Sequence, residues 1–75
     1  MKQELFDMLY TAALAERSKA LLTLNLLSEH PAGIGDHSTG DFYENATTAL
    51  TALVDADDKI AALERYFKPS VNVLD

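Results

Sequence analysis

The chain has 75 residues, with 12 Asp or Glu against six Lys or Arg and a formal net charge of −6. A chain this short makes one domain at most, and it buries only about 60% of the surface of its unfolded state. It has no cysteine, so neither disulfides nor cysteine-ligated zinc can support it, and self-association becomes the leading expectation. The acidic balance argues against nucleic acid or an anionic membrane as partner, since both are bound by clustered Lys and Arg.

The hydrophobic residues are spread along the chain and do not form a membrane segment. No uncharged apolar run approaches the roughly 18 residues of a membrane span, and no segment has the organisation of a signal peptide. We therefore expect a soluble protein of the cytoplasm.

The first predicted element is a helix over about residues 2–29. This segment contains no Gly or Pro and is dense in Leu, Ala, Glu and Lys, which are good helix formers. Pro31, Gly33 and Gly35 follow it. Because proline cannot continue a helix and glycine supplies turn conformations, residues of about 30–38 are predicted to form a loop.

The second predicted helix covers about residues 39–67, and a short tail, 68–75, follows it. Ser38 and Asp41 have the spacing of a capping box, although Thr39 or Asp41 could be the cap instead. Along this helix apolar residues recur at alternating steps of four and three, which is a heptad pattern and predicts a left-handed crossing of about 20° with another helix. These seam residues are Phe42, Ala46, Ala49, Leu53, Ala56, Ile60, Leu63 and Phe67.

The first helix carries two apolar stripes that compete for the core. One consists of Leu5, Met8, Ala12, Ala15, Leu22 and Leu26, interrupted by Lys19, and the other of Phe6, Tyr10, Ala13, Ala20, Leu24 and Leu27, interrupted by Arg17. A helix this apolar around its circumference needs more than one neighbour. We therefore predict an all-α fold with a single domain over 1–75, an antiparallel two-helix hairpin that completes a four-helix bundle as a homodimer. The predicted interface residues are Leu5, Met8, Ala12, Ala15, Leu22, Leu26, Ala49, Leu53, Ala56 and Ile60.

A weak candidate metal site lies in the predicted loop. His30, Asp36 and His37 combine imidazole and carboxylate groups, which suit divalent transition metals. However, the two histidines are not at the spacing that aligns ligands on one helical face. The interpretation we favour has His30 at the carbonyl end of the first helix and the other two in solvent. No cofactor is predicted.

The cluster Asp55, Asp57 and Asp58 allows a second metal hypothesis. Asp55 and Asp58 form a D-x-x-D pair of the kind that contributes to magnesium sites. Such a site needs more carboxylates facing it. The first helix offers Asp7 and Glu16, but no Glu-x-x-Glu or Glu-x-x-His pair appears in the sequence. We favour a solvated face on which Asp55 pairs with Lys59.

Residues 16–19, Glu-Arg-Ser-Lys, form a polar turn in an otherwise apolar helix. At least one of these residues is expected to point toward a neighbouring helix. We predict that Arg17 meets Asp55 or a carboxylate of a second chain, and that this pair fixes the register of the helices. No catalytic residue is predicted, because the sequence contains no phosphate-binding glycine loop, dinucleotide fingerprint or Ser-His-Asp set.

Three segments resemble small helical proteins encoded by tailed phages, particularly marine ones. They are the sequence from Leu21 to Leu27, the loop phrase from Gly33 to His37, and the helix end from Leu63 to Phe67. The family carries no assigned activity or functional residues. The resemblance implies a viral origin, a place in the host cytoplasm and an accessory or host-interaction role.

We therefore expect a small acidic interaction protein that associates with itself and with an unidentified protein partner. One alternative is a small metal-dependent hydrolase or metal binder that uses the loop residues His30, Asp36 and His37. The other alternative is a decoy whose acidic side chains imitate nucleic acid.

Overall fold

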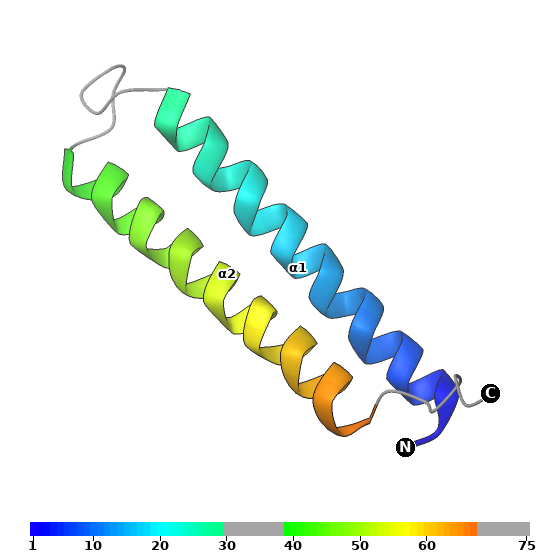
Figure 1. Ribbon diagram of the computed structural model, residues 1–75. Coiled ribbons are helices and arrows are strands. Elements are labelled where there is room, and N and C mark those ends of the chain that lie inside the picture. The colour runs from blue at the N-terminus through cyan, green and yellow to red at the C-terminus, as the bar shows by residue number, and fades with distance from the viewer. Residues whose placement is uncertain (30–38, 68–75) are drawn as a thin grey trace.

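The computed structural model describes residues 1–29 and 39–67, which form two long helices (Figure 1). Helix α1 covers Gln3–Glu29 and helix α2 covers Thr39–Tyr66. They lie antiparallel and in contact along their length, so the predicted all-α two-helix hairpin is confirmed. The sequence predicted helices over about 2–29 and 39–67. The predicted loop, the tail and the capping residue Ser38 lie outside the described residues.

Both helices are stabilised at their ends by backbone bonds and by charge. The amide of Phe6 donates to the carbonyl of Lys2, and the amide of Phe67 donates to the carbonyl of Leu63, each at 3.0 Å. The first turn of α1 contains Glu4, and that of α2 contains Asp41. Acidic side chains at these positions interact favourably with the partial positive charge at a helix N-terminus.

The heptad seam of α2 faces α1, as the sequence predicts. Ala49, Ala56, Ile60 and Leu63 are buried, and Phe42, Ala46 and Leu53 are half-buried. Only Phe67, at the end of the seam, is exposed, at 44%. The alternation of steps of four and three therefore identified the contact face of α2 correctly.

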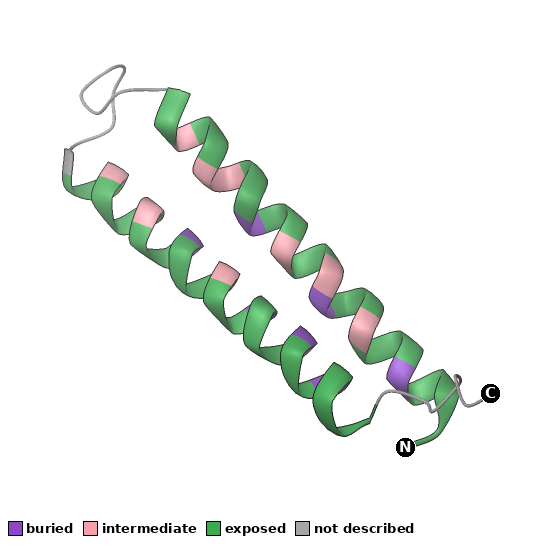
Figure 2. Cartoon of the chain, viewed as in Figure 1, coloured by how far each residue is buried: buried purple, intermediate pink, exposed green. Residues whose placement is uncertain are grey.

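The structure decides which of the two stripes of α1 contacts α2. Phe6, Ala13 and Ala20 are buried, whereas every residue of the competing stripe is exposed. Figure 2 shows the buried positions of both helices along the sides that face each other. Tyr10, Leu24 and Leu27 complete the inner face as half-buried residues, and Arg17 fills the gap between them.

The core between the two helices is thin. Its seven buried hydrophobic residues include four alanines, so only Phe6, Ile60 and Leu63 are large. Twelve large hydrophobic side chains of the described residues are exposed instead: Met1, Leu5, Met8, Leu9, Leu21, Leu22, Leu26, Tyr43, Leu50, Val54, Tyr66 and Phe67. More large apolar side chains therefore face outward than inward.

Neither of the two described helices has the combination of length and hydropathy that a membrane-spanning helix requires.

Candidate interaction surface

An exposed apolar stripe runs along the side of α1 that turns away from α2. We call Leu5, Met8, Ala12, Ala15, Leu22 and Leu26 the outer stripe. Its four large side chains have exposed fractions between 46% and 64%, and both alanines are exposed. Because these residues follow one another at helical spacing, they share one face from the first turn of α1 to its last. Lys19 is the one charged residue in this row.

The residues predicted to form an interface fall into two groups. The six on α1 are the outer stripe, and all of them are exposed. The four on α2 are covered by α1, with Ala49, Ala56 and Ile60 buried and Leu53 half-buried. The α2 group is thus already used inside the hairpin, and the outer stripe is the part that remains open to a partner.

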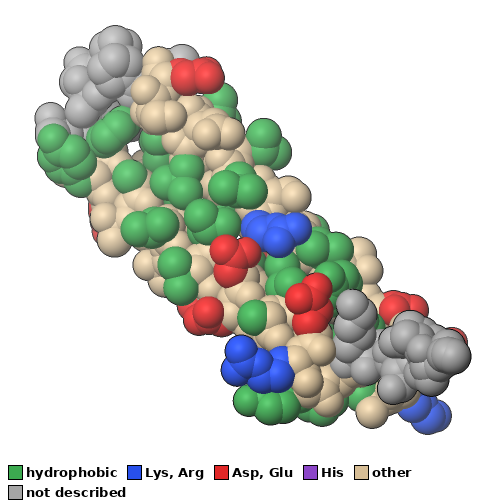
Figure 3. Space-filling model, viewed as in Figure 1, with side chains coloured by type: hydrophobic (Ala, Val, Ile, Leu, Met, Phe, Trp, Pro, Cys, Tyr) green, Lys and Arg blue, Asp and Glu red, His purple; other side chains and the backbone are tan. Residues whose placement is uncertain are grey.

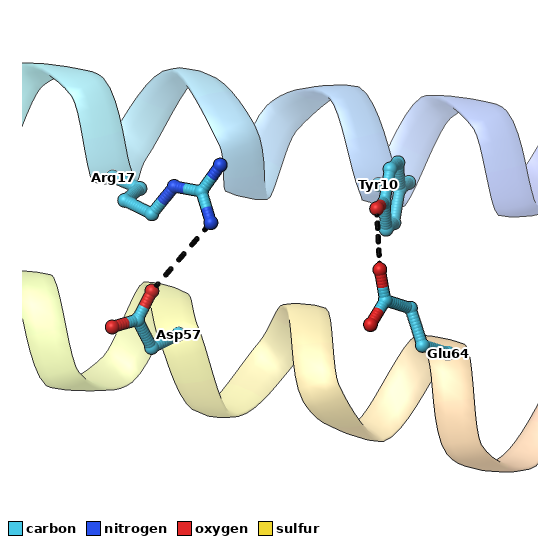
Figure 4. Close-up of polar contacts among 4 residues, drawn as sticks. All are labelled: Tyr10, Arg17, Asp57 and Glu64. Carbon is cyan, nitrogen blue, oxygen red and sulfur yellow. Dashed lines mark hydrogen bonds and ion pairs between the residues drawn. The ribbon is translucent and has the colours of Figure 1, made fainter.

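Three polar contacts cross between the helices beside the core. The hydroxyl of Tyr10 donates to Oε2 of Glu64 at 2.6 Å, and Arg17 lies 3.9 Å from Asp57 (Figure 4). Nζ of Lys59 donates to Oε1 of Glu16 at 3.0 Å, which is also an ion pair.

Two of these contacts differ from the sequence predictions. Arg17 meets Asp57, where Asp55 or a carboxylate of a second chain was expected. Lys59 contacts Glu16 on the other helix, where it was expected to pair with Asp55 on its own helix. The physical reason is the direction of the seam. At about 100° per residue, Asp57 and Lys59 lie on either side of the seam formed by the buried Ala56 and Ile60, whereas Asp55 lies farther around the helix.

The contact between Tyr10 and Glu64 shifts the pKa of Tyr10. The hydrogen bond to Glu64 raises the pKa of Tyr10 above its usual value, and partial burial and the negative charge of Glu64 add to this effect. Arg17 acts in the opposite direction. Tyr10 therefore remains protonated and able to donate its hydrogen bond over a wider pH range than a free tyrosine.

A shallow groove of about 490 Å³ runs beside the core on one flank of the hairpin. The groove forms because several of the side chains that line it on the two helices are small, including Ala20, Ala49 and Ala52. Glu16 and Lys19 are at its border. A second hollow, of about 240 Å³, is lined by Leu9, Lys59, Ala62 and Leu63. The groove and the hollow are both open to solvent, so side chains of a neighbouring helix can enter them.

Exposed hydrophobic and charged side chains are unevenly distributed on the face seen in Figure 3. In the half nearer the helix ends Glu29 and Thr39, hydrophobic side chains extend over both helices. In the half nearer the opposite ends, Asp, Glu, Lys and Arg side chains are interspersed among them. Apolar surface is therefore not confined to the outer stripe.

The structure does not describe the candidate metal ligands of the predicted loop. His30, Asp36 and His37 all lie outside the described residues. Within residues 1–29 and 39–67, no three His, Cys, Asp or Glu side chains are grouped so that they could hold a metal ion. Asp55 and Asp58 are exposed on α2.

Comparisons with family models, with curated proteins and with solved structures find no match to this chain. The proposed function therefore rests on the exposed apolar surface of the hairpin.

Proposed function

We propose that this chain is a homo-oligomeric interaction protein, in which the outer stripe of α1 packs against a second copy. The observation that carries the proposal is the exposure of that stripe along the whole of α1, with Leu22 64% and Met8 59% exposed. Contiguous apolar surface of this kind is typical of protein interfaces. Each large side chain fully removed from water would contribute about 1.5–3 kcal/mol.

The total exposed area of the chain supports a second copy as the partner. The chain exposes 5,608 Å², whereas a compact monomer of 8.2 kDa is expected to expose about 4,500 Å². The difference is of the same order as the roughly 800 Å² that one subunit buries in a standard interface. A second copy docked on the outer stripe would bring the exposed area per chain into the ordinary range.

The position of the outer stripe defines the kind of assembly. Because α2 covers the opposite side of α1, a second copy on the outer stripe would make α1 an inner helix and α2 an outer one. Two hairpins related by a twofold axis would then form a four-helix assembly with both α1 helices at its centre. The groove beside the core and the smaller hollow would border the neighbouring hairpin.

Within this proposal, the wider role is that of an accessory protein which presents a helical surface to another protein. The resemblance to proteins of tailed phages supports this role over an enzymatic one. The exposed apolar residues of α2, Tyr43, Leu50 and Val54, offer surface for a further protein partner outside the outer stripe.

The test is a pair of matched variants on the two helices. Leu22→Gln with Leu26→Gln places two polar side chains on the outer stripe, and Leu50→Gln with Val54→Gln makes the same change on α2. Light scattering at a series of concentrations measures the dissociation constant of the oligomer. The α1 variant should have a dissociation constant at least tenfold higher than that of the unmodified chain, and the α2 variant should have one close to that of the unmodified chain. An α1 variant that associates as tightly as the unmodified chain would contradict the proposal.

A further inference from the structure

We infer that the second copy binds antiparallel, so that the α1 helices of the two chains run in opposite directions along their outer stripes. This inference rests on the proposed function, because it specifies how the same surface is occupied. It follows from the charges in and around the stripe, from the sizes of its residues and from the polarity of the helices.

Lys19 is the residue that distinguishes the two possible directions. It is the only charge within the outer stripe, between Ala15 and Leu22. In a parallel pair with twofold symmetry, Lys19 would lie directly opposite Lys19 of the second copy, inside an apolar contact where like charges are poorly screened. In an antiparallel pair the two lysines lie on opposite sides of the axis and are separated along the helices.

The antiparallel direction also gives each Lys19 a favourable environment. With the twofold axis at the middle of the stripe, Lys19 falls opposite Ala12, within the segment of the other α1 between Asp7 and Glu16. This segment contains two carboxylates at its ends and no Lys or Arg. The side chains of Asp7 and Glu16 are both exposed.

The distribution of side-chain size suits a twofold axis across the middle of α1. Large residues occupy both ends of the outer stripe, Leu5 and Met8 at one end and Leu22 and Leu26 at the other, and Ala12 and Ala15 occupy the middle. The small residues allow the two backbones to approach closely at the axis. The large residues of one end then pack against those of the other end of the second copy.

Helix polarity favours the same direction. Each α1 carries a partial positive charge at its beginning and a partial negative charge at its end. In an antiparallel pair, opposite charges lie at the same level. The hairpin itself uses this arrangement, because α1 and α2 are antiparallel and approach each other through the buried alanines Ala13, Ala20, Ala49 and Ala56.

Distance measurements between spin labels test the inference, and the absence of native cysteine allows labels to be placed freely. Glu4→Cys and Asn25→Cys each introduce one label site at an exposed position near opposite ends of α1. An antiparallel pair separates two Glu4→Cys labels by about 35 Å along the helix axis, at 1.5 Å per residue. Mixing the two variants should add a separation below about 20 Å, between position 4 of one chain and position 25 of the other.

The outcomes separate this inference from the proposed function. A short separation in the Glu4→Cys dimer alone would overturn the antiparallel direction and leave the outer stripe as the interface. A dimer in which both the single variant and the mixture give long separations would overturn the use of the outer stripe, and the direction with it. Labelled chains that sediment as folded monomers would contradict the proposed function itself.

Discussion

The hydroxyl of Tyr10 donates a 2.6 Å hydrogen bond to the carboxylate of Glu64, and it joins the beginning of α1 to the end of α2. The ring of Tyr10 also stacks on that of Phe6, with centroids 5.3 Å apart. Together with the contacts of Arg17 and Glu16 farther along α1, this bond fixes which residues of the two helices lie side by side.

The Tyr10 contact predicts a loss of stability at alkaline pH. Because the pKa of Tyr10 is raised in the folded chain, its contribution is present below the ordinary tyrosine pKa of about 10 and is lost as the pH rises through the folded value. Denaturant unfolding followed by circular dichroism at pH 8 and pH 11 should show a smaller loss for Tyr10→Phe than for the unmodified chain. Tyr43→Phe is the control and should behave as the unmodified chain. Equal losses in all three would contradict the assignment.

Because the helices approach each other closely, the effect of replacing an alanine by leucine on the unfolding free energy should depend strongly on the position of that alanine. Ala56 has no exposed surface, so Ala56→Leu forces extra volume into the contact and should cost about 1–3 kcal/mol of unfolding free energy. The matched change Ala61→Leu, at an exposed position of the same helix, should stay within about 0.5 kcal/mol. The denaturation midpoints measure both, and equal effects would place the contact face elsewhere.

Arg17 is predicted to provide register and not stability. It lies in the row of inner-face residues of α1, yet its side chain remains 41% exposed and its distance to Asp57 is long. Arg17→Met keeps the aliphatic packing and should leave the unfolding free energy unchanged or raise it by about 1 kcal/mol. We expect the variant to sediment as a less uniform population of oligomers. A destabilised but uniform assembly would reverse this interpretation.

The ion pair between Glu16 and Lys59 should contribute modestly. Both side chains are about half exposed, at 50% and 57%, where water and salt screen the attraction. A double-mutant cycle with Glu16→Gln and Lys59→Met should give a coupling energy of about 0.2–1 kcal/mol at low salt. The coupling should shrink in 1 M NaCl, and an unchanged value would mean that the pair is shielded from solvent.

The fold was predictable from the sequence because the loop-forming residues and the spacing of the apolar residues indicate the same two helices. Pro31, Gly33 and Gly35 separate two uninterrupted helical segments, and the seam of α2 repeats without a break from Phe42 to Leu63. A single regular stripe can face only one neighbour, so the contact side of α2 followed directly.

The contact side of α1 did not follow, because its two stripes are almost equally apolar and each is interrupted by one cation. The structure places the stripe with Arg17 inward, where Arg17 can reach Asp57 and Tyr10 can reach Glu64. Sequence reasoning missed Asp57, Glu64 and the Glu16 partner of Lys59. Projecting α2 from its seam would have found the positions of Asp57 and Lys59 at the edges, but their partners depend on which stripe of α1 turns inward.

The most direct test of the account is sedimentation equilibrium of the unmodified chain from about 1 to 200 μM, with helix content followed by circular dichroism on the same samples. We predict a folded, helical species whose mass is twice 8.2 kDa at the higher concentrations, with dissociation accompanied by loss of helix on dilution. A fully helical species of 8.2 kDa throughout this range would contradict the central claim that the outer stripe of α1 is covered by a second copy.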